Sequence, residues 1–272
     1  MKAFQYRDSK LNQIEKIDIN DLGFLRGYGV FDFIRTYNRK PFLMEEHLKR
    51  LMRSASIINL DVEISLSELA KIVKSLSQEG SGEKTIRIIL TGGQSKNALN
   101  KDNLACNTYL IVENLAPVDS RIYSEGVKLI TCEYKRELPG AKTLNYINLI
   151  KHEYKLGREG AFTLLYVNCN KVLEAAISNI FIVKGSRIIT PFDGILLGTT
   201  RKLVIDIASG KFTVEERDIE LPELLEAEEV FITGTTQGIV PVVKVDSYSI
   251  NSGQVGNITR SLIDDFNKYT IQ

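Results

Sequence analysis

Two Gly-Thr-Thr tripeptides, at 198–200 and 234–236, are the clearest candidates in this sequence for binding an anion. The first opens a predicted helix, and the second follows a predicted strand at 229–233. The first turn of a helix presents backbone N–H groups that have no partner within the helix, and threonine hydroxyls add donors, so such segments suit a phosphate dianion. The same residues are also explained without a ligand, by a helix cap at Thr200 and a simple turn at Gly234.

Three charged residues could do chemistry beside such a phosphate. Lys142 follows a Pro-Gly pair and precedes a helix predicted at 143–156. Desolvation lowers the pKa of an inward-facing lysine and makes its amine a nucleophile or a Schiff-base partner. Glu174 follows a predicted strand and Arg50 lies on an amphipathic helix. Each of the three is equally compatible with a solvated surface charge, and an exposed ion pair at Arg50 contributes at most about 1 kcal/mol.

The elements that must position these residues mix strands and helices along the whole chain. Alternating or β-branched runs predict strands, and three- and four-residue apolar spacing predicts helices. Strands are expected at 31–37, 85–91, 107–115, 127–133, 162–168, 180–183, 187–190 and 229–233, and helices at 43–58, 65–76, 143–156, 198–208, 222–228 and 256–269. Because the alternation lacks regular βαβ spacing, it favours an α+β or mixed α/β fold over a doubly wound sheet.

The length of 272 residues predicts two domains, since a domain averages about 150 residues. The residues at 116–125 are the best linker candidate, because Pro, Asp, Ser and Gly gather there. We therefore expect a smaller N-terminal α/β domain at 1–115 and a larger C-terminal cofactor-binding domain at 126–272. A polar loop at 92–104 is a candidate lid.

Composition excludes several classes of function. The formal net charge is +1, so no global field attracts nucleic acid or an anionic membrane. The three cysteines are odd in number and far apart, which fits a reducing compartment, and two histidines without metal-ligand spacing argue against a zinc site. No signal-peptide core and no membrane-length apolar run is present. We expect a cytoplasmic protein without a metal, a nucleic-acid partner or a membrane partner.

Six sequence blocks, in order, resemble the fold-type IV pyridoxal-phosphate enzymes, also called class IV aminotransferases. That family includes branched-chain aminotransferases, D-amino-acid aminotransferases and aminodeoxychorismate lyases. The resemblance runs from about residue 23 to 266 and implies a two-domain fold like that of the D-amino-acid aminotransferases. The blocks are GYGVFD (27–32), EEHLKRL (45–51), KTLNY (142–146), LEAAISNIF (173–181), LGTTR (197–201) and EVFITGTTQGIVPV (229–242).

The resemblance implies roles for individual residues toward pyridoxal 5′-phosphate. Lys142 forms the internal aldimine and then moves the proton between the substrate Cα and the cofactor. Glu174 faces the pyridine nitrogen and keeps the ring protonated, and Tyr146 hydrogen-bonds the phenolic oxygen. The cofactor phosphate is bound by Arg50, Thr199, Thr200, Thr235 and Thr236.

Three residues bear on substrate choice. Arg26 stands where branched-chain enzymes often have tyrosine, and Phe31 stands where D-amino-acid enzymes commonly have a pocket tyrosine. Arg87 lies on a strand that borders the substrate pocket in the family. Two arginines could clamp an α-carboxylate, each charge-assisted bond contributing roughly 1.5–3 kcal/mol. The alternative is that Arg87 pairs with a neighbouring acid and Arg26 points to solvent.

The resulting hypothesis is a pyridoxal-phosphate transaminase that moves an amino group between an amino acid and a 2-oxo acid, with D-amino acids favoured. A branched-chain L-amino-acid aminotransferase is the first alternative, and a 4-amino-4-deoxychorismate lyase is the second. A family member that binds without catalysis is disfavoured by the presence of Lys142 and Glu174. The resemblance also implies a homodimer with active sites near the interface.

Overall fold

A computed structural model of the chain describes residues 1–95 and 105–271, so the expected loop at 92–104 lies largely outside the described residues. Two compact units make up the fold. Unit 1 comprises Met1–Ala116 together with Gly140–Asn145, and unit 2 comprises Pro117–Pro139 and Tyr146–Gln272. No helix in the described ranges is long and apolar enough to cross a membrane. Those ranges also hold no cluster of three or more His, Cys, Asp or Glu side chains able to bind a metal ion.

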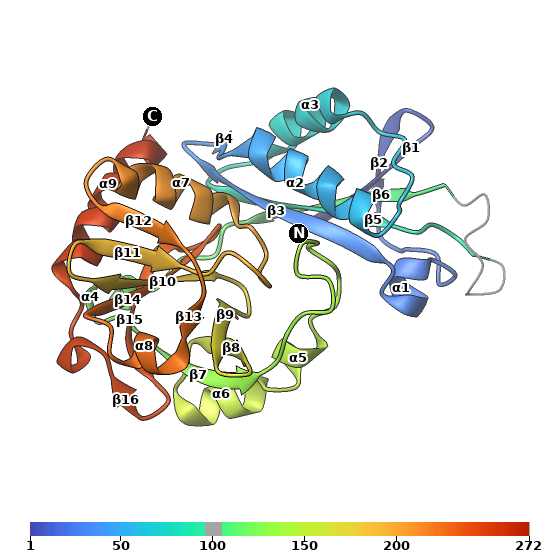
Figure 1. Ribbon diagram of the computed structural model, residues 1–272. Helices are drawn as coiled ribbons and strands as arrows, with labels where there is room; N and C mark the ends of the chain where they lie inside the picture. The colour runs from blue at the N-terminus through green and yellow to red at the C-terminus, as the bar shows by residue number, and fades with distance from the viewer. Residues whose placement is uncertain (96–104, 272) are drawn as a thin grey trace. The chain divides into compact units, whose positions relative to one another are not determined.

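Unit 1 is a six-stranded sheet in the order β2-β1-β6-β5-β3-β4, with two helices, α2 and α3, on one face (Figure 1). Its elements are β1 (Lys2–Arg7), β2 (Lys10–Ile14), α1 (Leu22–Arg26), β3 (Gly29–Tyr37), β4 (Lys40–Pro41), α2 (Met44–Ile57), α3 (Leu66–Ser77), β5 (Lys84–Thr91) and β6 (Asn107–Asn114).

Buried and half-buried residues alternate along β3, so the two faces of the unit 1 sheet differ. Val30, Asp32, Ile34 and Thr36 are fully buried, whereas the odd-numbered residues from Phe31 to Tyr37 are half-buried. The buried face packs against α2 and α3, whose apolar side chains recur at helical spacing. The opposite face, called here the odd face, carries Phe31 and its neighbours on β5.

Unit 2 is built on a ten-stranded mixed sheet in the order β12-β11-β10-β14-β15-β7-β8-β9-β13, with β16 paired to β15. Its elements are α4 (Arg121–Ser124), β7 (Val127–Glu133), α5 (Ile147–Ile150), α6 (Glu153–Glu159), β8 (Thr163–Asn168), β9 (Lys171–Ala175), β10 (Asn179–Lys184), β11 (Arg187–Thr190), α7 (Thr199–Ser209), β12 (Thr213–Glu216), β13 (Ile219–Glu220), α8 (Leu221–Leu225), β14 (Glu229–Gly234), β15 (Gly238–Val245), β16 (Tyr248–Ser249) and α9 (Asn257–Ile271).

The core of unit 2 divides between the two faces of its sheet. Along β8, Leu165 and Val167 belong to one buried cluster, and Leu164 and Tyr166 belong to another that also contacts α5 and α6. This division follows from the two-residue side-chain period of a strand. Helices α7 and α9 pack beside each other against β14 and β15 (Figure 1).

Most of the predicted elements are present, but the helix expected at 143–156 is wrong in its first part. Residues Gly140–Asn145 run beside β3, where Phe31 N donates to Lys142 O at 2.9 Å and Leu144 N donates to Gly29 O at 3.1 Å. The chain becomes helical only at Ile147. Lys142 therefore belongs to unit 1, not to the C-terminal domain in which the expected boundaries had placed it.

The linker expected at 116–125 carries structure of its own. It contains the short helix α4, and Tyr123 OH donates to the backbone oxygen of Gln237 at 2.8 Å. Strands β1, β2, β9, β12, β13 and β15 have no counterpart among the predicted elements. The division between the two units falls at Ala116, one residue beyond the end expected for the N-terminal domain.

A buried charged cluster fastens α2 to β3. Asp32 Oδ2 accepts from Arg50 Nε at 2.8 Å, and Asp32 Oδ1 accepts from Arg50 Nη2 at 2.8 Å and lies 2.7 Å from His47 Nδ1. Burial alone would raise the pKa of Asp32, but Arg50 and His47 together lower it below its usual range. Burial lowers the pKa of His47, and the positive charges of Arg50 and Lys142 act in the same direction. Asp32 acts in the opposite direction but does not reverse the shift. The ring is therefore neutral in the folded protein near pH 7.

The free energy of unfolding should fall as the pH is lowered from about 7 to about 5. An unfolded histidine gains a proton near pH 6.5, whereas folded His47, with its lowered pKa, resists protonation. The unfolded state then binds more protons, and stability falls by at most about 1.4 kcal/mol per pH unit for one group. Replacing His47→Gln removes this group, so denaturant titrations from pH 5 to 7 should show a smaller slope.

His152, the chain's other histidine, lies outside the cluster in unit 2 and provides the matched control. His152→Gln should retain the slope of the unmodified protein. The stability that Asp32 contributes, because its pKa is lowered, is lost only below about pH 4. An unchanged slope from pH 5 to 7 in His47→Gln would show that His47 does not carry the effect.

Candidate functional site

Lys142 is held beside β3 by both backbone and side-chain contacts. Its carbonyl accepts from Phe31 N, and its own N–H donates to Ser54 Oγ of α2 at 3.1 Å. Because residues 30 and 143 form an antiparallel bridge, Lys142 pairs with Phe31 and its side chain points to the same face. The Nζ atom lies 4.6 Å from the centre of the Phe31 ring. The lysine is thus half-buried on the odd face, as a reactive amine requires.

Arg87 lies on this same odd face. On β5, Arg87 is opposite Phe33 and Ile89 is opposite Phe31, and directly paired antiparallel residues share a face. The Arg87 guanidinium carbon lies 5.6 Å from the centre of the Phe33 ring. In the described part of the chain, no carboxylate lies within ion-pair distance of Arg87. The alternative in which Arg87 pairs with a neighbouring acid is therefore wrong for the described residues.

Arg50 and Arg26 occupy different surroundings in unit 1. Arg50 is 12% exposed in its side chain and makes the paired contacts to Asp32 described above. These contacts hold the guanidinium in one orientation. Arg26 is the last residue of α1, is exposed, and donates from Nη1 to the carbonyl of Leu25 at 2.7 Å. Among the described residues, no contact brings the side chains of Arg26 and Arg87 together.

Glu174 is turned by a bulge in β9. Leu165 pairs with Ala175 and Val167 pairs with Val172, so two residues of β9, one of them Glu174, stand opposite one residue of β8. A bulge of this kind redirects side chains. Val172 and Ala175 both stay in the interior cluster. Without the extra residue, alternation would place the Glu174 carboxylate in that apolar interior.

Arg136 is the partner of Glu174. Its Nε donates to Glu174 Oε1 at 2.7 Å and its Nη2 donates to Ala176 O at 2.6 Å. The guanidinium carbon lies 5.2 Å from the ring centre of Tyr146 and 5.7 Å from that of Tyr166. The second carboxylate oxygen, Oε2, accepts from Leu196 N at 3.2 Å. The buried carboxylate is therefore paired and oriented, and Tyr146 belongs to the same cluster.

The two Gly-Thr-Thr segments lie against one turn, at Ser178-Asn179. A Cβ added to Gly198 would come within 2.1 Å of Asn179 Oδ1, and one added to Gly234 would come within 3.0 Å of Ser178 Oγ. At positions 198 and 234, only glycine lets the backbone come this close to the turn without displacing a neighbouring atom. This turn joins β10 to the strand that carries Glu174.

The four threonines occupy the positions that an anion site needs. Thr199 and Thr200 are the first residues of α7, and Gly198 is its N-cap, so Thr200 is not the helix cap. Thr235 and Thr236 form the turn between β14 and β15. The left-handed residue of that turn is Gly238, with φ +69°, rather than Gly234. Therefore Thr200 is not explained as a helix cap, and Gly234 is not explained as the left-handed residue of a turn.

A buried hydroxyl next to this turn has no partner in the described structure. Thr233 is 2% exposed and its Oγ1 makes no hydrogen bond among the described residues. Thr233 is paired with Asn179 across the sheet, so the two side chains share a face. An unpaired buried hydroxyl costs roughly 1–3 kcal/mol. A polar group at this end of β14 is the kind of feature that a bound ligand satisfies.

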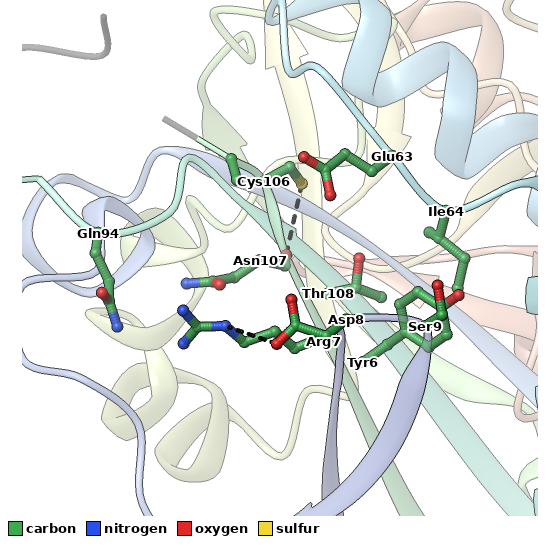
Figure 2. A pocket seen from close by; sticks show the side chains of 11 residues that line it. Tyr6, Arg7, Asp8, Ser9, Glu63, Ile64, Gln94, Cys106, Asn107 and Thr108 are labelled. Atoms are coloured by element: carbon green, nitrogen blue, oxygen red, sulfur yellow. Dashed lines mark hydrogen bonds and ion pairs between the residues drawn. The ribbon is translucent and has the colours of Figure 1, made fainter. Parts of the chain in front are cut away.

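A separate pocket of about 470 Å³ lies in unit 1, between the β1–β2 hairpin and β6 (Figure 2). Its lining includes Tyr6, Arg7 and Cys106, and none of the predicted site residues. Burial raises the pKa of the Cys106 thiol to about 12, so the sulfur is protonated and a poor nucleophile. The size of this pocket alone does not mark it as the reactive site.

Sequence reasoning missed the residues that hold the predicted ones in place. Arg136, in the charged run Lys135-Arg136-Glu137, is typical of a solvated surface. Asp32 and His47 were inside the quoted blocks, but nothing in the pattern assigned them a contact. The sequence does contain a signal for Asp32, because this charged residue lies between Val30 and Ile34 on the apolar, buried side of the strand.

Comparisons with known proteins show the family of this chain. The family model for amino-transferases of class IV matches residues 29–245. The chain is 33% identical over 261 residues to a putative branched-chain-amino-acid aminotransferase of Methanocaldococcus jannaschii, covering 92% of this chain and 90% of the relative. It is 31% identical over 267 residues to a D-alanine aminotransferase of Staphylococcus epidermidis, covering 93% and 92%.

The fold is also shared with a solved structure. The branched-chain amino acid aminotransferase of Escherichia coli superposes with a TM-score of 0.90 at 23% identity, covering 98% of this chain and 94% of that chain. The expected two-domain α+β architecture is thereby confirmed. Because the family model matches most of the chain and the relatives match over nearly their full lengths, this protein belongs to the class IV aminotransferases and has the fold-type IV architecture.

Proposed function

We propose that this aminotransferase favours D-amino acids as amino donors, with D-alanine or D-glutamate as donor and pyruvate or 2-oxoglutarate as acceptor. The preference rests on an arginine site for the substrate α-carboxylate, and the position of Arg87 is the observation that supports this site most directly. It shares the odd face with Lys142, and no described carboxylate neutralises it. Phe31 and Phe33, the ring neighbours of Lys142 and Arg87, are two residues apart on β3, which is about 7 Å. An α-carboxylate is attached one carbon away from the amino group, so a long arginine side chain can reach it.

Class IV aminotransferases depend on pyridoxal 5′-phosphate, which is the cofactor of this chain. The residues of unit 2 fit a phosphorylated ligand. Two threonine pairs and the start of α7 lie against the Ser178-Asn179 turn, and the buried Thr233 hydroxyl lacks a partner in the described residues. We assign Thr199, Thr200, Thr235, Thr236 and Arg50 to the cofactor phosphate.

Lys142 is assigned two tasks. Its amine would hold the cofactor and would accept the proton from the substrate Cα. When bound, the cofactor supplies an aldehyde that captures amino groups and a pyridine ring that withdraws electrons from Cα. Phe31 packs against the lysine and limits where its amine can move. Tyr146 is assigned a hydrogen bond to the phenolic oxygen of the cofactor.

Glu174 is assigned to the pyridine nitrogen. A carboxylate there favours the protonated ring, which is the stronger electron acceptor. Arg136, with its Nε 2.7 Å from Glu174 Oε1, fixes the orientation of the carboxylate. Removing this cation would leave a buried carboxylate without its arginine partner, which is a costly arrangement. Arg136 therefore acts through Glu174 rather than on the substrate.

We further propose a homodimer in the cytoplasm. Ile147, Ile150 and Tyr154 are 71%, 65% and 79% exposed in the single chain and recur at helical spacing along α5 and α6. An exposed apolar stripe of this kind is typical of an interface with another subunit. All three cysteines are free thiols, which agrees with a reducing compartment.

The role of Lys142 can be tested by labelling. Borohydride treatment of the purified protein, followed by peptide mass analysis, should find the mass of the reduced cofactor on the peptide that contains Lys142. Lys142→Ala should lose the label, and transamination should fall by about 10²- to 10⁴-fold, because the acid and base is removed. Lys151→Ala, which removes an exposed lysine nearby in the sequence, should keep both the label and the transamination activity. A label on another lysine would reassign the role.

Donor preference can be read from a single half-reaction. With no 2-oxo acid present, D-alanine should convert the cofactor to its amino form, seen as loss of the visible absorption band, much faster than L-leucine does. The reverse order would select the branched-chain alternative. Continuous release of pyruvate from aminodeoxychorismate, without a second substrate, would select the lyase.

Arg87→Ala should raise the KM for D-alanine about 10- to 100-fold, because one charge-assisted contact to the α-carboxylate is lost. Cofactor content, measured by absorbance after dialysis, should be unchanged. Arg35→Ala removes another cation from the same face, two residues beyond Phe33, and serves as the matched control with an unchanged KM. If Arg87→Ala and Arg35→Ala have the same KM for D-alanine, Arg87 does not bind the α-carboxylate.

A further inference from the structure

The carboxylate of Asp21 joins three elements of unit 1. It is 1% exposed, and its Oδ1 accepts from Gly23 N at 2.7 Å, capping α1. Its Oδ2 accepts from Thr91 Oγ1 at 2.8 Å, Asn107 Nδ2 at 2.8 Å and Tyr109 OH at 2.9 Å. The donors come from α1, the end of β5 and the start of β6. All four are neutral, so the carboxylate has no cation as partner in this cluster.

Helix α1 needs such an anchor because it has only five residues. An isolated helix of that length is unstable in water, so its position must come from tertiary contacts. Backbone contacts add to the anchor: Leu22 N donates to Gly93 O at 2.9 Å, and a Cβ on Gly23 would come within 2.4 Å of Thr91 Cγ2. The only residue of α1 whose side chain is buried is Leu22.

The face on which α1 is anchored is the one that carries the reactive groups. Thr91, Ile89 and Arg87 alternate along β5 and therefore share the odd face. Helix α1 thus docks on the end of the face that presents Arg87 and Lys142, and it ends in Arg26. Among the described residues, the Arg26 side chain donates a hydrogen bond only within its own helix, to Leu25 O. The direction of Arg26 is therefore set by the placement of α1.

We infer that Asp21 is a positioning residue for substrate binding: by fixing α1 on β5 and β6, it determines where Arg26 presents its guanidinium to the α-carboxylate. This inference rests on the proposed role of Arg26 in the carboxylate site. Asp21 does not touch the substrate. It acts through the helix, and the hydroxyls of Thr91 and Tyr109 and the amide of Asn107 are its supports.

The test is a double-mutant cycle on the full-length holoenzyme. The probe is 2-aminoisobutyrate, an achiral amino acid that cannot lose a Cα proton, with binding followed by the change in cofactor absorbance. Asp21→Asn keeps the shape of the side chain but replaces one acceptor oxygen with an NH2 group. That group would face the N–H and O–H donors that now bind the carboxylate. The substitution should weaken binding about tenfold with cofactor content unchanged. In an Arg26→Ala background, Asp21→Asn should have no further effect, because the group it positions is gone.

Two further variants separate positioning from general loss of stability. Tyr109→Phe removes one of the four donors and should give a smaller effect in the same direction, of about threefold. Asp246→Asn alters a comparable half-buried carboxylate in unit 2, which accepts from Thr131 N and Oγ1 at 2.8 Å each. It should leave probe binding unchanged even where it lowers stability. Amide hydrogen exchange should accelerate within α1 in Asp21→Asn and not in Asp246→Asn.

A tenfold effect that persists in the Arg26→Ala background would overturn the inference, as would unchanged probe binding in Asp21→Asn. Unchanged binding in Arg26→Ala alone would overturn the role of Arg26 and the inference with it, while leaving the transaminase function intact. Failure of the proposed function has a different result, since the unmodified holoenzyme would then neither bind the probe nor transaminate D-alanine.

Discussion

The backbone pairing between β3 and Gly140–Asn145 is the contact on which the reactive half of unit 1 depends. It places Lys142 opposite Phe31, and strand geometry then determines which face the amine occupies. Ser54 of α2 adds one side-chain contact to the same backbone. The segment that carries Lys142 is not itself a strand, but its backbone hydrogen bonds to the rigid strand β3 fix the direction of the lysine.

Three buried carboxylates in this fold are satisfied in different ways. Asp32 and Glu174 each pair with an arginine, whereas the donors to Asp21 among the described residues are all neutral. Replacing a buried ion pair by apolar residues often leaves stability unchanged or raises it, so such pairs are poor stabilisers. What they provide here is a single orientation for each guanidinium. The near-zero net charge of the chain therefore conceals buried local charges, two of which lie in the proposed binding regions.

The sequence predicted the strands and helices whose patterns are long and regular. The stripe on α2 and the alternation on β3 are examples, because each is a repeat that burial of one face enforces. The order of the motifs, rather than any single residue, led to the roles proposed for Lys142, Glu174 and both threonine segments. The bulge at Glu174 could not be predicted, since a one-residue shift leaves no mark on the local composition. The β1–β2 hairpin was missed although Asp8-Ser9 between alternating residues is a turn signal.

Pairing of Gly140–Asn145 with unit 1 also has a consequence for biosynthesis. The chain leaves unit 1 at Ala116, begins unit 2, and returns to unit 1 for six residues before completing unit 2. Until residue 145 has left the ribosome, the Gly29–Phe31 edge of β3 lacks its partner and stays open to pairing with other chains. The two units therefore cannot fold as independent, successive domains. Lys142, the residue proposed to bind the cofactor, is carried by the same segment that pairs with this edge of β3.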